Sequence, residues 1–303
     1  MKVLITGAGG FIGNYLLGSF QSDNNEIIAA YRNHCPEIKD PAAGSVRLVR
    51  TDLSESVEGL EPVDVVIHTA GHTNQIPDST ADDYIRSNVL GTLNLANYAK
   101  AANPRIFIYL STISMYGEAS NLELDEDAPL NNPSIYGYTK YMGELILKDY
   151  ARYFPSVCIR LPGVVGPGYF KPWIGRVLQK ALGNEPISFY NPEFTFNNVV
   201  HLADLARFIS TVIESGAQGY NYVTLAADAP MAIRDVVQLI INLTGSGSQA
   251  LENDTNKSSF LIRQDKIKDV YQFQPATTDW TIRRYVKENL GSYSLSQGTR
   301  VTG

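Results

Sequence analysis

A glycine-rich turn, TGAGGFIG, spans residues 6–13 and follows the short apolar run KVLIT at the start of the chain. Its glycines include positions 7, 10 and 13, and FIGNYLLGSF continues from it as a predicted helix. Glycine permits a tight turn and a close approach of the backbone, while a helix N-terminus attracts a pyrophosphate through its N–H groups and dipole. A strand, this turn and a helix together predict a dinucleotide-binding site, whereas a lone glycine triplet would indicate only a packing turn.

Apolar runs and helix-like stretches alternate through the first half of the chain. Several runs are apolar at nearly every position, as strands buried on both faces of a sheet must be. The alternation predicts an α/β fold with a doubly wound parallel sheet of the Rossmann type. The runs are KVLIT (2–6), EIIAAYR (26–32), VRLVRTD (46–52), VDVVIHTA (63–70), RIFIYLST (105–112) and VCIRLPGV (157–164).

The composition excludes several classes of partner. A net charge of −6 provides no basic surface for nucleic acid, so we expect no such partner. Two cysteines, Cys35 and Cys158, predict neither a disulfide framework nor a metal site, and they fit a reducing, cytoplasmic setting. Met1 leads directly into KVLIT without room for a signal peptide. No apolar run approaches the roughly 18 residues that cross a bilayer, so we expect no membrane association.

The end of the second predicted strand indicates which cofactor is bound. An acidic residue at this place accepts the 2′-OH of NAD, whereas an arginine accommodates the 2′-phosphate of NADP. The chain has Arg32 in AAYRN and no acid nearby, which favours NADP and leaves NAD as the alternative. Arg32 could instead stack on an adenine or face solvent. Asp52, which closes LVRTD, is placed either to accept a hydrogen bond from the adenine amino group or to lie in an exposed loop.

Eight motifs follow one another in a characteristic order. Together they resemble the extended short-chain dehydrogenase/reductase family, which contains nucleotide-sugar epimerases, dehydratases and reductases. The resemblance covers nearly the whole chain, to about residue 275. The motifs are TGAGGFIG, the Asp52-Leu53 pair, HTAG (68–71), SNVLGTLNLANYA (87–99), LSTISMYG (110–117), YGYTKYMGE (136–144), RLPGVVGPG (160–168) and VVHLADLA (199–206).

The resemblance implies a catalytic set of Thr112, Tyr136 and Lys140. Alone, a tyrosine and a lysine four positions apart would be ordinary neighbours on one helix face. In this family the tyrosine exchanges a proton with the substrate while hydride moves to or from the nicotinamide, and a nearby ammonium favours the tyrosinate form. Lys140 would also bind the nicotinamide ribose. Thr112, four residues before Tyr116 of LSTISMYG, would position the reacting oxygen.

The resemblance assigns further residues to the cofactor. Ala70 and Gly71 would let the ribose approach the fourth strand, and Pro162 and Gly163 would border the nicotinamide amide. Asn88 would hold the backbone of the site, although a simple N-cap is an equal alternative. The predicted cofactor-binding set is Gly7, Gly10, Phe11, Ile12, Gly13, Arg32, Asp52, Leu53, Ala70, Gly71, Asn88, Tyr136, Lys140, Pro162 and Gly163.

The resemblance also implies two domains. Residues 1–165 and 197–226 would form the cofactor-binding domain, and residues 166–196 and 227–290 a smaller substrate-binding part. Residues 291–303 are predicted to be a disordered tail, and the polar stretch 246–259 to be mobile. The helices around residues 82–100 and 133–153 form a dimer interface in many members of the family, which predicts a homodimer.

The substrate contacts are the least specific part of the resemblance. Many family members carry an arginine shortly before the VxHxxDLA segment that grips a diphosphate, but NPEFTFNNVVHLADLA has none. Lys171, Arg176, Lys180 and Arg263 are candidate replacements, each with a surface charge as the alternative. Ser114 is a further candidate for contact with the substrate.

Several activities are compatible with this reading. The leading hypothesis is reduction of a nucleotide-linked 4-keto-6-deoxy sugar by NADPH, because Arg32 favours NADP. A C4 epimerase with tightly held NAD is the main rival, and a reductase of carbonyl compounds without a nucleotide would explain the missing arginine. A dehydratase is disfavoured, because Ile113 and Ser114 replace the acidic pair that usually follows the threonine. A non-catalytic NADP-binding redox sensor is the alternative from another class.

Overall fold

The computed structural model describes residues 1–23, 25–38, 45–118, 122–253 and 259–298. The chain divides into two compact units. The first unit contains Met1–Gly117, Glu126–Leu161 and Ala206–Thr224, and the second contains Glu118–Asp125, Pro162–Leu205 and Leu225–Gly303. Among the described residues, no helix combines the length and apolar character needed to cross a membrane.

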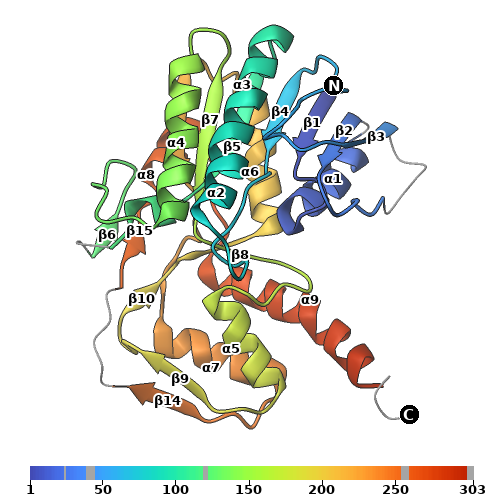
Figure 1. Cartoon of the computed structure of the whole chain (residues 1–303). Helices are drawn as coiled ribbons and strands as arrows, with labels where there is room; N and C mark the ends of the chain where they lie inside the picture. The colour runs from blue at the N-terminus through green and yellow to red at the C-terminus, as the bar shows by residue number, and fades with distance from the viewer. Residues whose placement is uncertain (24, 39–44, 119–121, 254–258, 299–303) are drawn as a thin grey trace. The chain divides into compact units, whose positions relative to one another are not determined.

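The first unit is built on a seven-stranded sheet in which all neighbouring strands are parallel (Figure 1). The strand order is β12-β7-β5-β4-β1-β2-β3, so the chain moves outward from β1 in one direction and then returns to extend the sheet in the other. This confirms the predicted doubly wound parallel sheet. The strands are β1 (Lys2–Thr6), β2 (Glu26–Tyr31), β3 (Ser45–Arg50), β4 (Val65–His68), β5 (Ile106–Thr112), β7 (Ser156–Leu161) and β12 (Tyr220–Thr224).

Helices bury the apolar strands of this sheet. Two of them, α3 and α4, lie side by side and pack on one face (Figure 1), through a cluster that includes Val66, Leu95, Phe107, Tyr109 and Leu147. The alternate residues of the same strands are also buried, which is why the runs read as apolar at almost every position. The helices that begin in or belong to this unit are α1 (Phe11–Ser22), α2 (Ala81–Tyr84), the π-helix η1 (Ile85–Leu90), α3 (Gly91–Ala102), the 3-10 helix η2 (Ile113–Tyr116) and α4 (Ile135–Tyr150).

The second unit has its own core and several short strand pairs. Its core joins residues of α5, α7 and α9, among them Leu178, Val237, Ile240 and Tyr285. The paired strands are β8 (Gly163–Val165) with β11 (Val199–His201), β9 (Ile187–Tyr190) with β14 (Ala250–Asn253), β10 (Thr195–Phe196) with β13 (Met231–Ala232), and β6 (Glu123–Leu124) with β15 (Leu261–Ile262). The helices are α5 (Trp173–Leu182), α7 (Ile233–Thr244), α8 (Asp265–Tyr271) and α9 (Thr278–Gly298), while α6 (Leu202–Glu214) begins in this unit and ends in the first.

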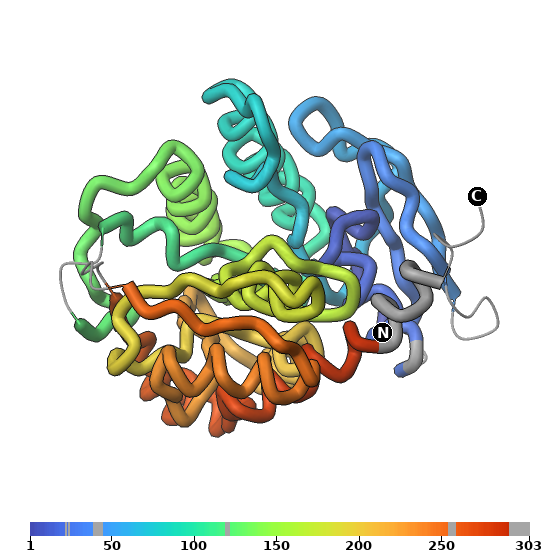
Figure 2. Tube along the Cα trace, turned by 90° about the horizontal axis from the view of Figure 1, so that it is seen from below, coloured from blue at the N-terminus to red at the C-terminus, as the bar shows by residue number. Residues whose placement is uncertain are grey.

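Three predicted boundaries differ from the structure. The segments 118–125, 162–165, 197–205 and 225–226, assigned to the cofactor-binding domain, fall in the second unit. Strand β14 occupies part of the predicted mobile stretch, because β9 supplies a pairing partner far away in sequence (Figure 2); residues 254–258 of that stretch lie outside the described residues. Helix α9 continues through residues 291–298, within the predicted disordered tail; residues 299–303 lie outside the described residues.

Candidate active site

The glycine turn closes tightly between β1 and α1. Gly7 has a φ of +69°, and a Cβ added to it would lie 2.6 Å from the backbone nitrogen of Ala70. The N–H of Gly10 donates to the carbonyl of Gly7 at 2.9 Å, and a Cβ on Gly13 would collide with the same carbonyl. Gly10 is the N-cap of α1 but gives it no side-chain cap, and the first turn contains no acidic residue. The backbone therefore presents a positive helix end without a carboxylate beside it.

A cavity of about 290 Å³ adjoins this turn in the first unit. It lies where the carboxyl ends of β1, β2 and β4 meet, next to the point where the strand order reverses. Open parallel sheets bind ligands at this place. The lining residues are Gly7, Gly9, Gly10, Ala30, Arg32, Asn33, His34, Thr51, Asp52, Leu53, Ser54, Thr69, Ala70, Gly71, Ile76 and Ser87.

Arg32 and Asp52 lie at the mouth of this cavity as a pair. An Nη1 atom of Arg32 is 3.6 Å from an Oδ2 of Asp52 and 3.4 Å from the Oγ of Ser87. The other carboxylate oxygen of Asp52 accepts from the backbone N–H of Ser54 at 3.0 Å and from its hydroxyl at 2.8 Å. Partial burial raises the pKa of Asp52. The hydrogen bonds from Ser54 and the charge of Arg32 lower the pKa by more than burial raises it, so the net shift is downward. Asp52 is therefore an ordered, ionised side chain.

Asn88 is buried within η1 and connects two parts of the site. Its Oδ1 accepts from the backbone N–H of His72 at 2.8 Å, and its Nδ2 donates to the carbonyl of His72 at 3.1 Å and to the hydroxyl of Thr139 at 3.0 Å. The N-cap of the helical segment is instead Thr80, which forms a capping box with Asp83. The N-cap alternative for Asn88 is thus wrong. Its side chain fixes the loop after β4 against α4.

The three predicted catalytic residues lie on β5 and α4, two elements in direct contact. Thr112 ends β5, and its hydroxyl accepts from the N–H of Ser114 at 3.1 Å, which caps the 3-10 helix η2. Tyr136 and Lys140 lie one turn apart on α4. Between them, Gly137 packs so closely on the carbonyl of Ser114 that a Cβ would collide with it. This glycine lets α4 approach the turn that follows Thr112.

Lys140 is buried, with only 5% of its surface exposed. Its ammonium lies 4.0 Å from the centre of the Tyr109 ring, on which it makes a cation–π contact. Within the described part of the chain, this ammonium has no hydrogen-bond acceptor and no ion-pair partner. Burial lowers the pKa of Lys140 to about 7, although Cys158 and Glu144 raise it in part. A Cβ added to Gly71, which lines the cavity, would lie 3.7 Å from the Lys140 Nζ.

Two supporting residues were not predicted from the sequence. Tyr109 lies beneath the ammonium of Lys140, and Thr139 receives the hydrogen bond from Asn88. Tyr109 belongs to an apolar strand outside the motifs, and Thr139 lies within YGYTKYMGE, where only Tyr136 and Lys140 were assigned a role. Only the pairing of β5 with its neighbours and the packing of α4 reveal their roles.

The predicted substrate contacts fall into different surroundings. Arg263 is already paired with Glu123 at 2.8 Å and Asp265 at 2.6 Å in the second unit. Arg176 is exposed and donates to the carbonyl of Lys171 at 2.7 Å, so these two cations are neighbours. Lys180 donates to the carbonyl of Pro186 at 3.4 Å.

Three further predicted residues follow strands of the parallel sheet. Ser114 lies on η2, in the first unit. Pro162 and Gly163 directly follow β7 and belong to the second unit. The contact of Pro162 and Gly163 with the cofactor, and that of Ser114 with the substrate, stay predictions.

Residues 3–224 match the family described as the NAD dependent epimerase/dehydratase family. The match spans well over half of the chain, so the chain belongs to this family, and the resemblance seen in the motifs is confirmed. It is an enzyme of the epimerase/dehydratase type, for which an NAD(P) cofactor is typical.

Similar proteins carry out several reactions. The chain is 25% identical to a dTDP-D-glucose 4,6-dehydratase of Mus musculus over 270 residues, covering 84% of this chain and 76% of the relative. It is 27% identical to a dTDP-4-dehydro-6-deoxy-D-allose reductase of Streptomyces sp over 300 residues, covering 90% and 91%. A solved UDP-N-acetylglucosamine 4-epimerase from Methanobrevibacter ruminantium M1, in complex with UDP-N-acetylmuramic acid, has a TM-score of 0.81 with 22% identity and 98% coverage of each chain. The structural likeness shows the shared fold.

The first unit fits an NAD(P) cofactor on three observations. The glycine turn has no space for side chains at Gly7 and Gly13, as a cradle for phosphates requires. The cavity continues from this turn to the end of β2, and its lining includes hydroxyl, amide and guanidinium groups. The ammonium of Lys140 lies beside Gly71 with a buried charge that a ligand oxygen would stabilise.

The close approach of η2 to α4 generates a stability prediction. Replacing Gly137→Ala adds a methyl group against the Ser114 carbonyl, and overpacking of this kind costs about 1–3 kcal/mol. Gly18→Ala in α1 is the matched control, because its Cβ would meet nothing within 4 Å and alanine favours a helix by about 0.5–1 kcal/mol. We expect urea unfolding to give a lower free energy for Gly137→Ala and a higher one for Gly18→Ala. Equal gains in both variants would contradict the contact.

Proposed function

We propose that this chain is an NADP-preferring oxidoreductase that reduces the keto group of a nucleotide-linked 4-keto-6-deoxy sugar, with Tyr136 as the proton donor. The observation that carries the proposal is the buried ammonium of Lys140. It lies one turn after Tyr136, on the helix that packs against the turn following Thr112. A buried cation without an acceptor in the described chain is costly unless a ligand satisfies it.

The chain's own residues divide the work of this reaction. NADPH, when bound, supplies the hydride. The hydroxyl of Thr112 holds the substrate oxygen, and the phenol of Tyr136 gives its proton to that oxygen as the carbonyl carbon receives the hydride. The positive charge of Lys140 stabilises the phenolate that remains, and the same ammonium binds the nicotinamide ribose. The proton of Tyr136 is then restored from solvent.

Reduction is favoured over the neighbouring reactions by the residues after Thr112. Elimination of water needs an acid and a base close to the sugar, and the 3-10 helix Ile113–Tyr116 contains no carboxylate. The Streptomyces reductase is matched over 91% of its length, and its name describes action on a 4-dehydro-6-deoxy sugar. A C4 epimerase remains the second candidate, because the fold is shared with solved epimerases.

The substrate's diphosphate needs cations that are not already neutralised. Arg263 is held by two carboxylates, which argues against the role suggested for it. Arg176 and Lys171 lie together at the start of α5, and the Arg176 guanidinium donates to a carbonyl rather than to a carboxylate. We therefore assign the diphosphate to Arg176, in place of the arginine that the segment before β11 lacks.

The proton donor is tested by Tyr136→Phe. Loss of general acid catalysis reduces turnover by about 10² to 10⁴ fold, so we expect kcat on 4-keto-6-deoxy sugar nucleotides to fall by at least about a hundredfold while NADPH affinity is kept. Tyr153→Phe, which removes the hydroxyl of an exposed tyrosine, is the control and should keep full activity. A Tyr136→Phe variant with unchanged kcat would rule out this mechanism, and a wild type that binds NADPH without any turnover would favour a redox sensor.

Cofactor preference is tested by Arg32→Ala. A charged hydrogen bond contributes about 1.5–3 kcal/mol, so NADPH should bind at least about tenfold more weakly, with NADH affinity unchanged. Both affinities are measured by fluorescence titration. Arg47→Ala is the control, because this exposed arginine pairs with Glu61 and does not line the cavity. An equal loss for both cofactors would contradict a contact to the 2′-phosphate.

The nucleotide that the purified protein retains distinguishes a reductase from an epimerase. A reductase must take up NADPH from solution, whereas an epimerase recycles tightly held NAD. Protein purified without added cofactor is denatured, and any released nucleotide is identified. Stoichiometric NAD would overturn the reductase and favour the epimerase.

We also propose that the protein is a homodimer through α4. Four large apolar side chains on this helix are between 37% and 50% exposed, and their spacing of three, four and three residues places them on one face. A contiguous exposed apolar face of this kind marks an interface. The residues are Ile135, Tyr138, Met142 and Leu145.

A charge in this face should dissociate the dimer. We expect Met142→Glu to shift the mass measured by light scattering from dimer to monomer, because the carboxylate cannot be buried unpaired. Val270→Glu on α8 is the control, since Val270 is 56% exposed and lies outside this face. A wild-type protein that is monomeric at all concentrations would contradict the proposal.

A further inference from the structure

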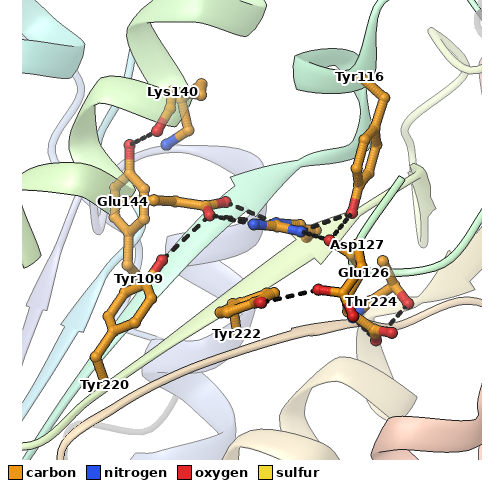
Figure 3. Close-up of polar contacts among 10 residues, drawn as sticks. Tyr109, Tyr116, Glu126, Asp127, Lys140, Glu144, Tyr220, Tyr222 and Thr224 are labelled. Atoms are coloured by element: carbon orange, nitrogen blue, oxygen red, sulfur yellow. Dashed lines mark hydrogen bonds and ion pairs between the residues drawn. The ribbon is translucent and has the colours of Figure 1, made fainter. Parts of the chain in front are cut away.

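A buried ion pair joins α4 to β7 behind the candidate site. Glu144 is fully buried and Arg160 is 4% exposed. The Nε of Arg160 donates to the Oε1 of Glu144 at 3.0 Å, and its Nη2 donates to the Oε2 at 2.7 Å (Figure 3). Glu144 lies one helical turn beyond Lys140 on α4. The guanidinium therefore holds the helix that carries both Tyr136 and Lys140.

The other side of the same guanidinium faces the turn that follows Thr112. Its Nη1 donates to the hydroxyl of Tyr116 and to the carbonyl of Glu126, each at 2.6 Å. Tyr116 is the last residue of η2, whose first N–H groups are capped by Thr112. Arg160 thus binds Glu144 of α4 and Tyr116 of η2 at the same time; Figure 3 labels these two partners.

The cluster also includes the edge strand β12. The carboxylate of Glu126 accepts from the backbone N–H of Thr224 at 2.7 Å and from its hydroxyl at 2.8 Å. The guanidinium of Arg160 stacks on the ring of Tyr222 at 4.5 Å, and the Tyr222 hydroxyl donates to Asp127 at 2.9 Å. These residues, with Tyr116, Glu144 and Arg160, are called the Arg160 cluster below.

The position of the cluster along the chain is informative. The chain crosses between the two units at five places, and four of them adjoin this cluster. Tyr116 lies one residue before the first crossing, and Glu126 directly follows the second. Arg160 lies one residue before the third, and Thr224 is the last residue before the fifth. The cluster therefore fixes the ends of the segments that lead to the second unit.

Stability alone does not require charges here. Two ions must be removed from water to make such a pair, and well-packed apolar residues of the same volume are often as stable or more so. Apolar residues, however, cannot bind Glu144, Tyr116 and the Glu126 carbonyl in one defined geometry, as the planar guanidinium does.

We propose that Arg160 is a positioning residue. Together with Glu144 it fixes α4, η2 and the ends of the segments that lead to the second unit in one arrangement, which aligns Thr112 and Tyr136 with the reacting carbonyl. The effect on the reaction rests on the proposed function, whereas the effect of the cluster on the placement of α4 and η2 does not. Arg160 touches neither substrate nor cofactor in this proposal. Its removal acts through the placement of α4 and η2.

The test uses the double variant Arg160→Met/Glu144→Leu in the full-length protein. Replacing both charges avoids an unpaired buried ion, so the melting temperature should stay within about 4 °C of the wild type. Because a misplacement of about 1 Å can cost up to a hundredfold in rate, kcat should fall at least about tenfold while NADPH affinity stays within about threefold. Arg234→Met is the matched control, because this exposed arginine also binds two carboxylates, Glu193 and Glu252, outside the first unit.

Tyr116→Phe keeps the test decisive if the double variant does not fold. It removes one hydroxyl from the guanidinium and leaves the ion pair and the ring in place. We expect kcat to fall at least about threefold in a folded variant whose melting temperature is lowered by only a few degrees, because one charged hydrogen bond is lost. Folded variants that both keep wild-type kcat would overturn the proposal.

Hydrogen exchange separates this inference from the proposed function. In both variants, the amides of residues 113–117 and 136–144 should exchange faster, while those of β1 and α1 stay unchanged. This measurement needs no turnover, so it decides the role of the cluster even if the wild type reduces none of the sugars offered. Unchanged exchange in both segments would overturn the inference. A wild type without activity would overturn only the proposed function.

Discussion

All seven strands of the first unit run in the same direction, so their carboxyl ends gather at a single edge of the sheet. The glycine turn follows β1, Arg32 follows β2, Gly71 lies three residues beyond β4, and Thr112 ends β5. The parallel pairing of the strands therefore brings residues that are far apart in sequence to one edge of the sheet. The cradle, the cavity and the catalytic elements all depend on this one property of parallel strands.

Close packing of α4 on β5 and η2 then places Tyr136 and Lys140 at this edge of the sheet. Two glycines of α4 make close contacts: a Cβ on Gly137 would collide with the Ser114 carbonyl of η2, and a Cβ on Gly143 would collide with the Tyr109 ring of β5. Glycine inside a helix costs about 0.5–1 kcal/mol relative to alanine, and two of them are tolerated here because they let α4 lie directly on β5 and η2. The hydrogen bonds of Asn88 to His72 and Thr139 also attach the same helix to the loop after β4.

The sequence predicted the features that depend on local patterns. Buried strands read as continuous apolar runs, and the glycine turn has a fixed spacing, so the sheet and the cradle followed directly. Partnerships over long distances could not be predicted in this way. Strand β14 looked like a polar loop because its partner β9 lies about 60 residues earlier. For Asn88 the resemblance implied a role in holding the backbone of the site, but the N-cap alternative stayed open, because its partners His72 and Thr139 are brought to it only by the tertiary fold.

The Arg160–Glu144 pair explains why the amine of Lys140 is left without a carboxylate partner among the residues that the structure describes. Glu144 lies four residues after Lys140, the spacing at which a carboxylate and an ammonium normally pair on a helix. Arg160 binds both oxygens of Glu144 instead, at 3.0 and 2.7 Å, and the ammonium of Lys140 turns to the ring of Tyr109. Burial then lowers the pKa of Lys140 to about 7, with Glu144 opposing the shift only in part. An ammonium held in an ion pair by Glu144 would be directed away from a phenolate or a ribose, so the same guanidinium that fixes the position of α4 also leaves the amine of Lys140 available.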